Sequence, residues 1–237
     1  VRYRHNDLQH LEQLLQKYHD DDQIERIIVV TESIFSMDGD ETDLTALVQL
    51  KKRFAKTMLY VDEAHSIGVR GQQGLGCAEQ YNVIQEIDFL VGTLGKALAA
   101  VGGYIICHPI IKDYLINKMR PLIFSTAQPP IVMAWANFIF KKVLMAQSQR
   151  EHLKNISQYL QQAVVQKGYM SPSTSHIIPV IVGESQAAID KAKQVQESGF
   201  YAMPVRPPTV PKNSSRLRIS LTSMVEQHEL EALVSFL

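Results

Sequence analysis

One lysine stands in the segment GTLGKALAAVGG (residues 92–103), whose other residues are small or apolar. A largely apolar run at 87–91 precedes the segment, so Lys96 is expected just beyond a buried strand. A lone lysine most often lies along the surface with its ammonium in water. The alternative is an amine held in a pocket, where it can bond covalently to an aldehyde. The rest of the chain decides between these two interpretations.

An aldehyde cofactor carried by lysine, pyridoxal phosphate, makes three further demands on a protein. A carboxylate must keep the ring nitrogen protonated, donors must hold the phosphate, and a polar group must fix the ring oxygen. Asp62 ends the apolar run 58–61 and suits the first role, because a buried carboxylate is costly unless it meets a cation. The structural alternative is an aspartate that only caps a helix or closes a turn.

Other polar residues lie at positions that suit the remaining roles. His65 could hydrogen-bond the cofactor or substrate, Thr93 could donate to the phosphate, and Ser36 could reach the ring oxygen. Gly92 and Gly95 would let backbone amides approach an anion. Taken singly, each residue has an ordinary structural explanation, such as a serine that closes a turn. Their combination with the lysine indicates a cofactor site.

Alternating strand and helix patterns are expected to position these residues. A helix capped by Asn6 or Asp7 comes first, and a helix over 44–54 is capped by Thr42 or Asp43. Such alternation indicates a mostly parallel α/β sheet, in which functional groups collect at the carboxyl ends of strands. The β-branched run at 26–31 is typical of a strand buried in such a sheet. Strands are predicted at 26–31, 58–62, 87–91 and 103–107.

The pattern changes after Pro130 to long helices and short strands, which indicates a smaller α+β domain. We therefore expect one domain over 1–148 and a second over 149–237. The segment 205–211 has too many prolines for a central strand and predicts a rigid connection. In the second half, helices are predicted at 131–147, 150–167, 185–198 and 226–236, and strands at 177–182 and 216–221.

The composition excludes several classes of function. Among 237 residues, 24 are basic and 24 acidic, and this zero net charge argues against nucleic acid or an anionic membrane as a partner. Two cysteines without metal-binding spacing predict neither a disulfide framework nor a metal site and suit a reducing cytoplasm. No apolar stretch is long enough to span a bilayer.

Five segments carry a resemblance to a known family: TESIFSMDGD, YVDEAHSIGVRGQQGLG, GTLGKALAAVGGYI, FSTAQPP and RPPTVPKNSSRLRISLT. They resemble the α-oxoamine synthases, which are pyridoxal-phosphate-dependent transferases of the aspartate aminotransferase fold (fold type I). The likeness runs essentially from end to end of the chain. It is strongest to members that condense L-alanine with a pimeloyl thioester, with loss of carbon dioxide, in biotin biosynthesis.

The resemblance implies roles for the residues of the lysine site. Lys96 would hold the cofactor covalently and act as acid and base at the substrate α-carbon, and Asp62 would pair with the pyridinium. His65 and Ser36 would contact the ring oxygen or the substrate, while Thr93 would bind the phosphate.

It also implies roles for residues further along the chain. Ser125 and Thr126 would reach the phosphate in the neighbouring subunit of a homodimer whose sites lie at the interface. Arg218 would bind the amino-acid carboxylate through a bidentate fork. Arg206 would contact the acyl substrate, or would simply be a surface arginine. Arg216 is expected to face away from the site.

Three matters stay open at this point. Sister synthases that take glycine or serine share the cofactor residues, and a non-catalytic partner subunit is a third interpretation. The acyl carrier could be coenzyme A or a carrier protein. Family members usually exceed 350 residues, so we expect that this chain lacks an N-terminal part and that its sheet has an exposed edge.

Overall fold

The computed structural model describes residues 1–237, which divide into two compact units. The first unit comprises 1–33 and 42–147, and the second comprises 34–41 and 148–237. The short segment 34–41, which the sequence boundary places in the first domain, thus groups with the second unit. Ser36 therefore belongs to the second unit.

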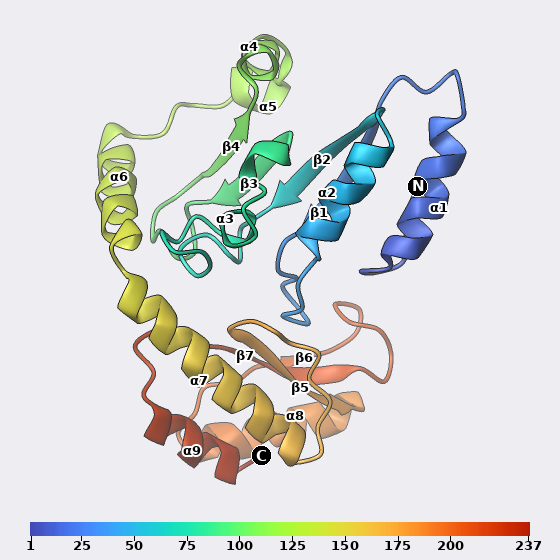
Figure 1. Ribbon diagram of the computed structural model, residues 1–237. Helices are drawn as coiled ribbons and strands as arrows, with labels where there is room; N and C mark the ends of the chain where they lie inside the picture. Colours follow the sequence, from blue (N-terminus) through green and yellow to red (C-terminus); the bar gives the residue numbers. More distant parts are fainter. The chain divides into compact units, whose positions relative to one another are not determined.

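The first unit is built on a four-stranded sheet in the order β1-β2-β3-β4 (Figure 1). The first three strands are parallel and β4 is antiparallel to β3, which confirms the predicted mostly parallel sheet. The strands are β1 (Ile27–Glu32), β2 (Thr57–Asp62), β3 (Phe89–Thr93) and β4 (Gly103–Cys107).

Helices of the first unit follow the predicted capping pattern at two positions. The Asp7 carboxylate accepts the His10 amide at 2.8 Å, and the Asp43 carboxylate accepts the Ala46 amide at 2.9 Å. Each therefore satisfies a backbone donor that the first helical turn leaves unpaired. The helices are α1 (Leu8–His19), α2 (Leu44–Arg53), α3 (Cys77–Gln80), the 3₁₀ helix η1 (Ile84–Glu86), α4 (Pro109–Lys118), α5 (Arg120–Ile123) and α6 (Pro130–Leu144).

The strand β1 is buried on one face only, contrary to the expectation from its β-branched sequence. Val29 and Thr31 are buried on the side where α1 and α2 pack, whereas Ile28 and Val30 are more than half exposed. β1 is also an edge strand of the sheet. The apolar composition of Ile27–Glu32 is typical of a strand that is buried on both faces, but here one face of the strand is exposed.

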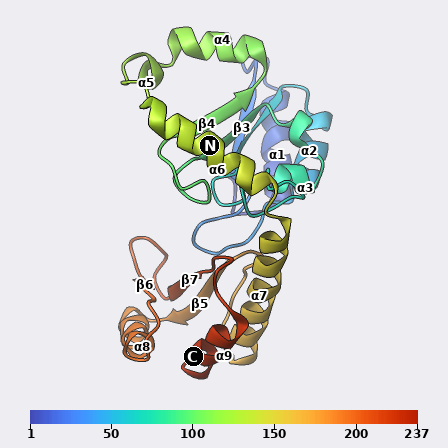
Figure 2. The same ribbon diagram turned by 90° about the vertical axis from the view of Figure 1, so that its left-hand side faces the viewer.

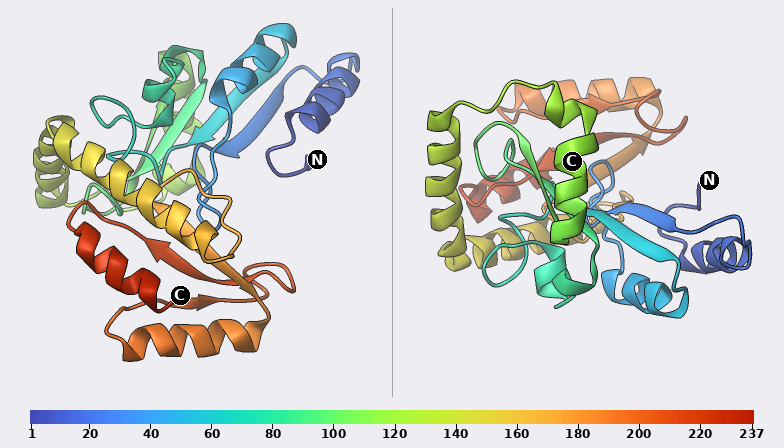
Figure 3. Two further views of the ribbon diagram at one scale, coloured as in Figure 1. Left: turned by 60° about the horizontal axis from the view of Figure 1, so that its bottom comes forward. Right: turned by 90° about the horizontal axis from the view of Figure 1, so that it is seen from above.

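The second unit consists of a three-stranded antiparallel sheet and three helices (Figures 2 and 3). The proline-rich segment 205–211 forms no central strand, as predicted. Only its first residue, Val205, belongs to a strand, and that strand, β6, lies at the edge of the sheet. The helix α8 packs against all three strands. The elements are α7 (Gln147–Gln166), β5 (Ile177–Gly183), α8 (Ser185–Glu197), β6 (Pro204–Val205), β7 (Ser215–Ser220) and α9 (Gln227–Ser235), in the sheet order β5-β7-β6.

The apolar cores form within each unit from the predicted helix and strand faces. In the second unit, Leu160 and Val164 of α7 and Val180 and Leu217 of the sheet are fully buried. In the first unit, Leu59 and Val61 of β2 are equally buried. No helix of the chain is both long enough and apolar enough to cross a membrane.

Candidate functional site

Lys96 lies in the connection between β3 and β4, which we call the lysine loop (residues 94–102). Its Nζ atom is 2.9 Å from Nε2 of His65, which follows the carboxyl end of β2. Backbone hydrogen bonds fold the loop back on itself, with the Leu94 amide donating to the Gly102 carbonyl at 2.9 Å. The lysine amine is exposed, so a ligand can reach it.

Asp62 lies at the same edge of the sheet as the lysine loop. It is the last residue of β2 and pairs in register with Val91 of the parallel strand β3, two residues before Thr93. One carboxylate oxygen accepts the Ala64 amide at 2.7 Å, which fixes the side chain and leaves the other oxygen for a cation. The structure therefore brings Asp62, His65 and Lys96 together at the carboxyl ends of two neighbouring strands.

Thr93 has partners inside the lysine loop. Its hydroxyl donates to the Gly102 carbonyl at 3.2 Å and accepts the Gly95 amide at 3.1 Å. The hydroxyl thus helps to shape the loop that carries Lys96. Phosphate binding by Thr93 stays a prediction.

Glu63 is a buried carboxylate that sequence analysis missed. It is inaccessible to solvent and accepts the Ala78 amide at 2.7 Å, the Cys77 amide at 3.0 Å and the Ser33 hydroxyl at 2.7 Å. The Ser66 hydroxyl also donates to it. Desolvation by burial raises the pKa of Glu63, although these donors act in the opposite direction.

These contacts give Glu63 a structural role beside the site. The carboxylate ties together the end of β1, the start of α3 and, through the Ser66 hydroxyl, the turn that follows Asp62 and carries His65. An acidic residue next to Asp62 in the sequence Asp-Glu-Ala-His was the only available signal. It could not be told apart from a surface charge.

Tyr104 explains the glycine at position 92. The two residues pair in register across β3 and β4, and a Cβ atom on Gly92 would come within 2.3 Å of the Tyr104 hydroxyl. Gly92 therefore makes room for the aromatic ring of Tyr104. The sequence alone instead predicts that this glycine lets a backbone amide approach an anion. Burial, followed by the charges of Glu63 and Asp62, raises the pKa of Tyr104 to about 12, so its phenol stays protonated at neutral pH.

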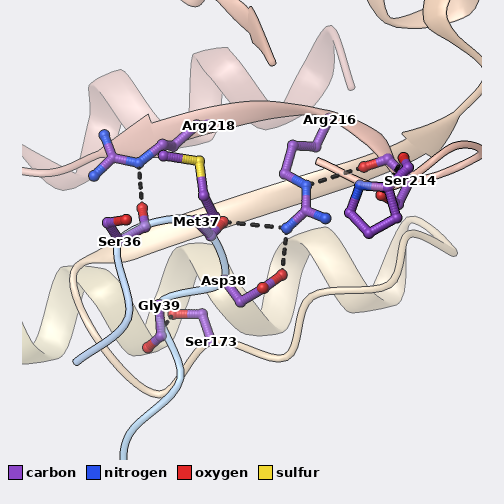
Figure 4. A network of polar contacts seen from close by, with 9 residues as sticks. Ser36, Met37, Asp38, Gly39, Ser173, Ser214, Arg216 and Arg218 are labelled. Carbon is purple, nitrogen blue, oxygen red and sulfur yellow. Dashed lines mark hydrogen bonds and ion pairs between the residues drawn. The ribbon is translucent and has the colours of Figure 1, made fainter. Parts of the chain in front are cut away.

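Ser36 and Arg218 lie in the second unit, where they contact each other (Figure 4). Arg218 Nε donates to the Ser36 carbonyl at 2.5 Å, and its Nη1 donates to the Ser220 hydroxyl at 2.8 Å. The guanidinium is about half buried, and this desolvation lowers the pKa of Arg218. Its Nη2 donors have no protein partner, which suits a carboxylate-binding arginine.

Arg216 does not face away from this region, so that prediction is wrong. It donates from Nη1 to the Met37 carbonyl at 3.2 Å and pairs with the Asp38 carboxylate (Figure 4). Residues two apart on a regular strand share a face, and β7 is regular over these residues as it pairs with β5. Arg216 and Asp38 are thus part of a network that sequence analysis missed.

The remaining predicted residues lie in exposed segments. Ser125 and Thr126 follow α5 and are exposed, and the Ser125 hydroxyl donates to the Pro121 carbonyl. Arg206 is exposed in the turn after β6, where its carbonyl accepts the Thr209 amide at 3.0 Å. All three side chains are accessible to a ligand or a partner subunit, and their roles stay predictions.

The donor set at the lysine loop fits an aldehyde cofactor with a cationic ring. An accessible amine, a histidine within hydrogen-bond distance and an oriented carboxylate lie at one edge of the sheet. No group of three or more histidine, cysteine, aspartate or glutamate side chains is arranged to hold a metal ion. The accessible Lys96 amine beside His65 and the oriented Asp62 carboxylate supports covalent chemistry at that amine.

Comparisons with known sequences agree with this chemistry. The family profile of aminotransferase class I and II matches residues 1–237. A protein of Pasteurella multocida is 54% identical over the whole of this chain and is provisionally named 8-amino-7-oxononanoate synthase. The chain covers 61% of that protein, and thus spans about three fifths of the length of such relatives.

Solved structures share the fold over the full chain. A serine palmitoyltransferase of Sphingomonas wittichii superposes with a TM-score of 0.91 at 31% identity, and the chain covers 59% of it. A serine palmitoyltransferase solved with a pyridoxal phosphate internal aldimine has a TM-score of 0.91 at 28% identity and the same coverage. The 8-amino-7-oxononanoate synthase of Francisella tularensis has a TM-score of 0.84 at 27% identity, with 67% of it covered.

Proposed function

The chain belongs to the aminotransferase class I and II family, and we propose that it acts with pyridoxal phosphate as an 8-amino-7-oxononanoate synthase. The reaction would condense L-alanine with a pimeloyl thioester and release carbon dioxide, as a step of biotin biosynthesis. The observation that carries the proposal is the 2.9 Å contact between Lys96 and His65 beside the oriented carboxylate of Asp62. The 54% identity to a relative of that name supports the choice of substrates.

Lys96 and Asp62 would perform the central chemistry. When bound, pyridoxal phosphate supplies an electron sink for the carbanion that forms at the substrate α-carbon. Lys96 would hold the cofactor through Nζ and, once displaced by the amino acid, would remove the α-proton and later return one. The negative charge of Asp62 would keep the ring nitrogen protonated.

His65 would orient the reacting groups. Its Nε2 lies within hydrogen-bond distance of the Lys96 amine, so it can hold that amine toward the cofactor ring. Ser36 would fix the ring oxygen or the substrate. Thr93, with the Gly95 amide next to it, would contribute to phosphate binding.

Arg218 would bind the carboxylate of the amino acid. Partial burial strengthens the attraction between a guanidinium and a carboxylate, and the unpartnered Nη2 provides donors for it. Arg206 would contact the acyl substrate from its exposed turn. Coenzyme A and a carrier protein remain alternative acyl carriers.

We further propose a cytoplasmic homodimer with shared sites, in which Ser125 and Thr126 contact the phosphate of the neighbouring subunit. Exposed apolar side chains around these residues support an interface, because soluble monomers rarely expose such groups together. Phe124 is 76% exposed, and Ile131, Trp135 and Phe138 are also exposed.

Sister α-oxoamine synthases are the second candidate function. The structural similarity to serine palmitoyltransferases favours considering them, and 2-amino-3-ketobutyrate CoA ligase and 5-aminolevulinate synthase use the same cofactor chemistry. A non-catalytic partner subunit is a weaker alternative, because the chain keeps Lys96, Asp62 and His65 together.

Competition between amino acids tests the assignment. The purified protein with pyridoxal phosphate and pimeloyl-CoA should use L-alanine in preference to glycine or L-serine, with kcat/KM at least about tenfold higher, the usual effect of one methyl group or hydroxyl in a pocket. A preference for serine with a long-chain acyl-CoA would instead identify a serine palmitoyltransferase. These 237 residues span 61% of such a relative, so the fragment alone is expected to be inactive if the rest of the site lies upstream. Absence of any condensation by a chain extended upstream to the relatives' length would favour a non-catalytic chain.

A further inference from the structure

The Nε and Nη1 groups of Arg216 donate hydrogen bonds to other residues of the second unit. Its Nε donates to the Ser214 carbonyl at 3.0 Å, and its Nη1 contacts both the Met37 carbonyl and the Asp38 carboxylate. Only 4% of Arg216 is exposed. A substrate carboxylate would have to displace Asp38 from this buried cation, so Arg216 itself is poorly suited to bind substrate.

Arg218 and Arg216 bind neighbouring carbonyl groups of the same segment. Its Nε orients the guanidinium on the Ser36 carbonyl, and the following carbonyl, that of Met37, is the one bound by Arg216 (Figure 4). A shift of this backbone would therefore turn the plane of the Arg218 guanidinium. A bidentate contact depends on that plane, because both N–H groups must point at the two carboxylate oxygens.

The segment 36–39 is also held from its other side. The Thr174 amide donates to the Gly39 carbonyl at 3.2 Å, and a Cβ atom on Gly39 would lie 1.9 Å from the Ile177 carbonyl oxygen. This close approach is possible because residue 39 is a glycine with φ of +69°. The segment is thus confined between the arginines of β7 and the start of β5.

We propose that Arg216 and Asp38 form a positioning pair that orients Arg218 and Ser36 toward the amino-acid substrate. The inference rests on the proposed function, in which Arg218 binds the substrate carboxylate. In this arrangement the strand β7 supplies two arginines with different tasks. Arg216 fixes the backbone of 36–38, and that backbone fixes the ligand-binding arginine.

Two variants weaken the pair in different ways. Arg216→Lys keeps a cation and loses the fork that reaches a carbonyl and a carboxylate together. Asp38→Asn removes only the charge, and because the Asp38 side chain is 34% exposed, this variant should fold. The matched control is Glu197→Gln, the same acid-to-amide change in the exposed ion pair with Lys193.

The first readout needs neither cofactor nor substrate. The Phe35 amide donates to the Asp40 carbonyl and the Gly39 amide to the Phe35 carbonyl, both at 2.9 Å, so their hydrogen exchange reports on the segment. Both variants should exchange these amides at least about tenfold faster, with circular dichroism unchanged, because exchange follows local opening. The Arg218 Nε–H signal in NMR spectra should broaden or shift, and Glu197→Gln should match the parent.

The second readout is the kinetic consequence for the amino acid. Arg216→Lys and Asp38→Asn should raise KM for L-alanine about tenfold or more while KM for the thioester stays unchanged, since misplacement of a binding group acts on its own ligand. Parent-like exchange in both variants would overturn the inference, as would faster exchange with an unchanged KM for alanine. If a chain extended upstream to the relatives' length makes no product, the proposed function fails, and the exchange rates and the Arg218 signal still decide whether the pair positions that arginine.

Discussion

The lysine region of the first unit and the arginine region of the second hold their functional groups in different ways. Asp62, His65 and Lys96 occupy the ends of parallel strands and the turns that follow, so the sheet itself brings them together. Arg216 and Arg218 instead hold a segment about 180 residues earlier in the sequence, at 36–38. The first arrangement depends on backbone topology, and the second depends on buried side-chain contacts.

This difference predicts where substitutions will act. In the lysine region the charge of Asp62 can be removed with little effect on folding, because backbone hydrogen bonds and the buried Glu63 maintain the turn that follows it. In the arginine region a single change loosens the segment that carries the site. Activity should therefore separate from stability in the first region, and the two should change together in the second.

The largest effect is expected for Asp62→Asn. The amide oxygen of asparagine can still accept the Ala64 amide, so the turn should persist, while loss of the charge should lower kcat on the order of 10²–10³-fold, as when other preorganised electrostatic contacts are removed. Steady-state kinetics and thermal unfolding of the same sample measure the two effects. The matched control is Asp88→Asn at the start of β3, where the carboxylate binds the Leu59 amide and Lys51. That change should lower stability and leave kcat unaltered, and the reverse pattern would contradict the assignment.

Gly39→Ala should destabilise the second unit by about 3 kcal/mol, the upper range for a strained backbone position. The added Cβ would meet the Ile177 carbonyl oxygen, and neither backbone can move freely. Gly168→Ala is the control, because Gly168 also has a positive φ and a Cβ there would meet nothing within 4 Å. It should cost only about 1 kcal/mol. Equal free energies of unfolding in urea for the two variants would show that segment 36–39 is not closely held.

Glu63→Gln should lower the free energy of unfolding by about 2 kcal/mol at neutral pH, because one amide cannot accept from all four donors that the carboxylate serves. The variant should also change the dependence of stability on pH. Because burial raises the folded-state pKa, the stabilisation linked to the Glu63 proton is complete below the ordinary value of 4.5 and is lost as pH rises through the raised value. Urea unfolding from pH 4 to pH 8 should show this decline in the parent and not in the variant.

The smallest effect is expected for Asp43→Ala, which removes the cap of α2. The Ala46 amide would lose its carboxylate acceptor, at a cost of about 1 kcal/mol. Asp43→Asn retains an acceptor oxygen and should recover most of that stability. A loss of activity beyond the stability change would indicate that α2 also controls the site.

The sequence predicted the elements of the first unit well because local signals determine them. Apolar runs marked the strands, and Asp7 and Asp43 marked the helix starts. The grouping of Asp62, His65 and Lys96 followed from the rule that strand ends collect functional residues. The helices α3, η1, α4 and α5 were not predicted. Three of them span only three or four residues, and α4 has no buried face to produce a periodic pattern.

The arginine network could not be predicted, because its partners are far apart in the sequence. Nothing near Arg216 indicates Asp38 as its partner, and the segment 34–41 was assigned to the first domain because it follows β1. Glu63 was missed for a related reason. Its burial depends on the packing of Ser33 and α3 around it, which no local pattern reveals.

Reduction with borohydride in the presence of pyridoxal phosphate tests the central claim most directly. Peptide mapping by mass spectrometry should find the reduced cofactor on Lys96, with no labelling at this peptide in Lys96→Ala. Selective labelling at Lys96 would show that the amine beside His65 is the covalent anchor. Labelling spread over exposed lysines, or unchanged by the Lys96→Ala substitution, would contradict the account and leave Lys96 as a surface cation.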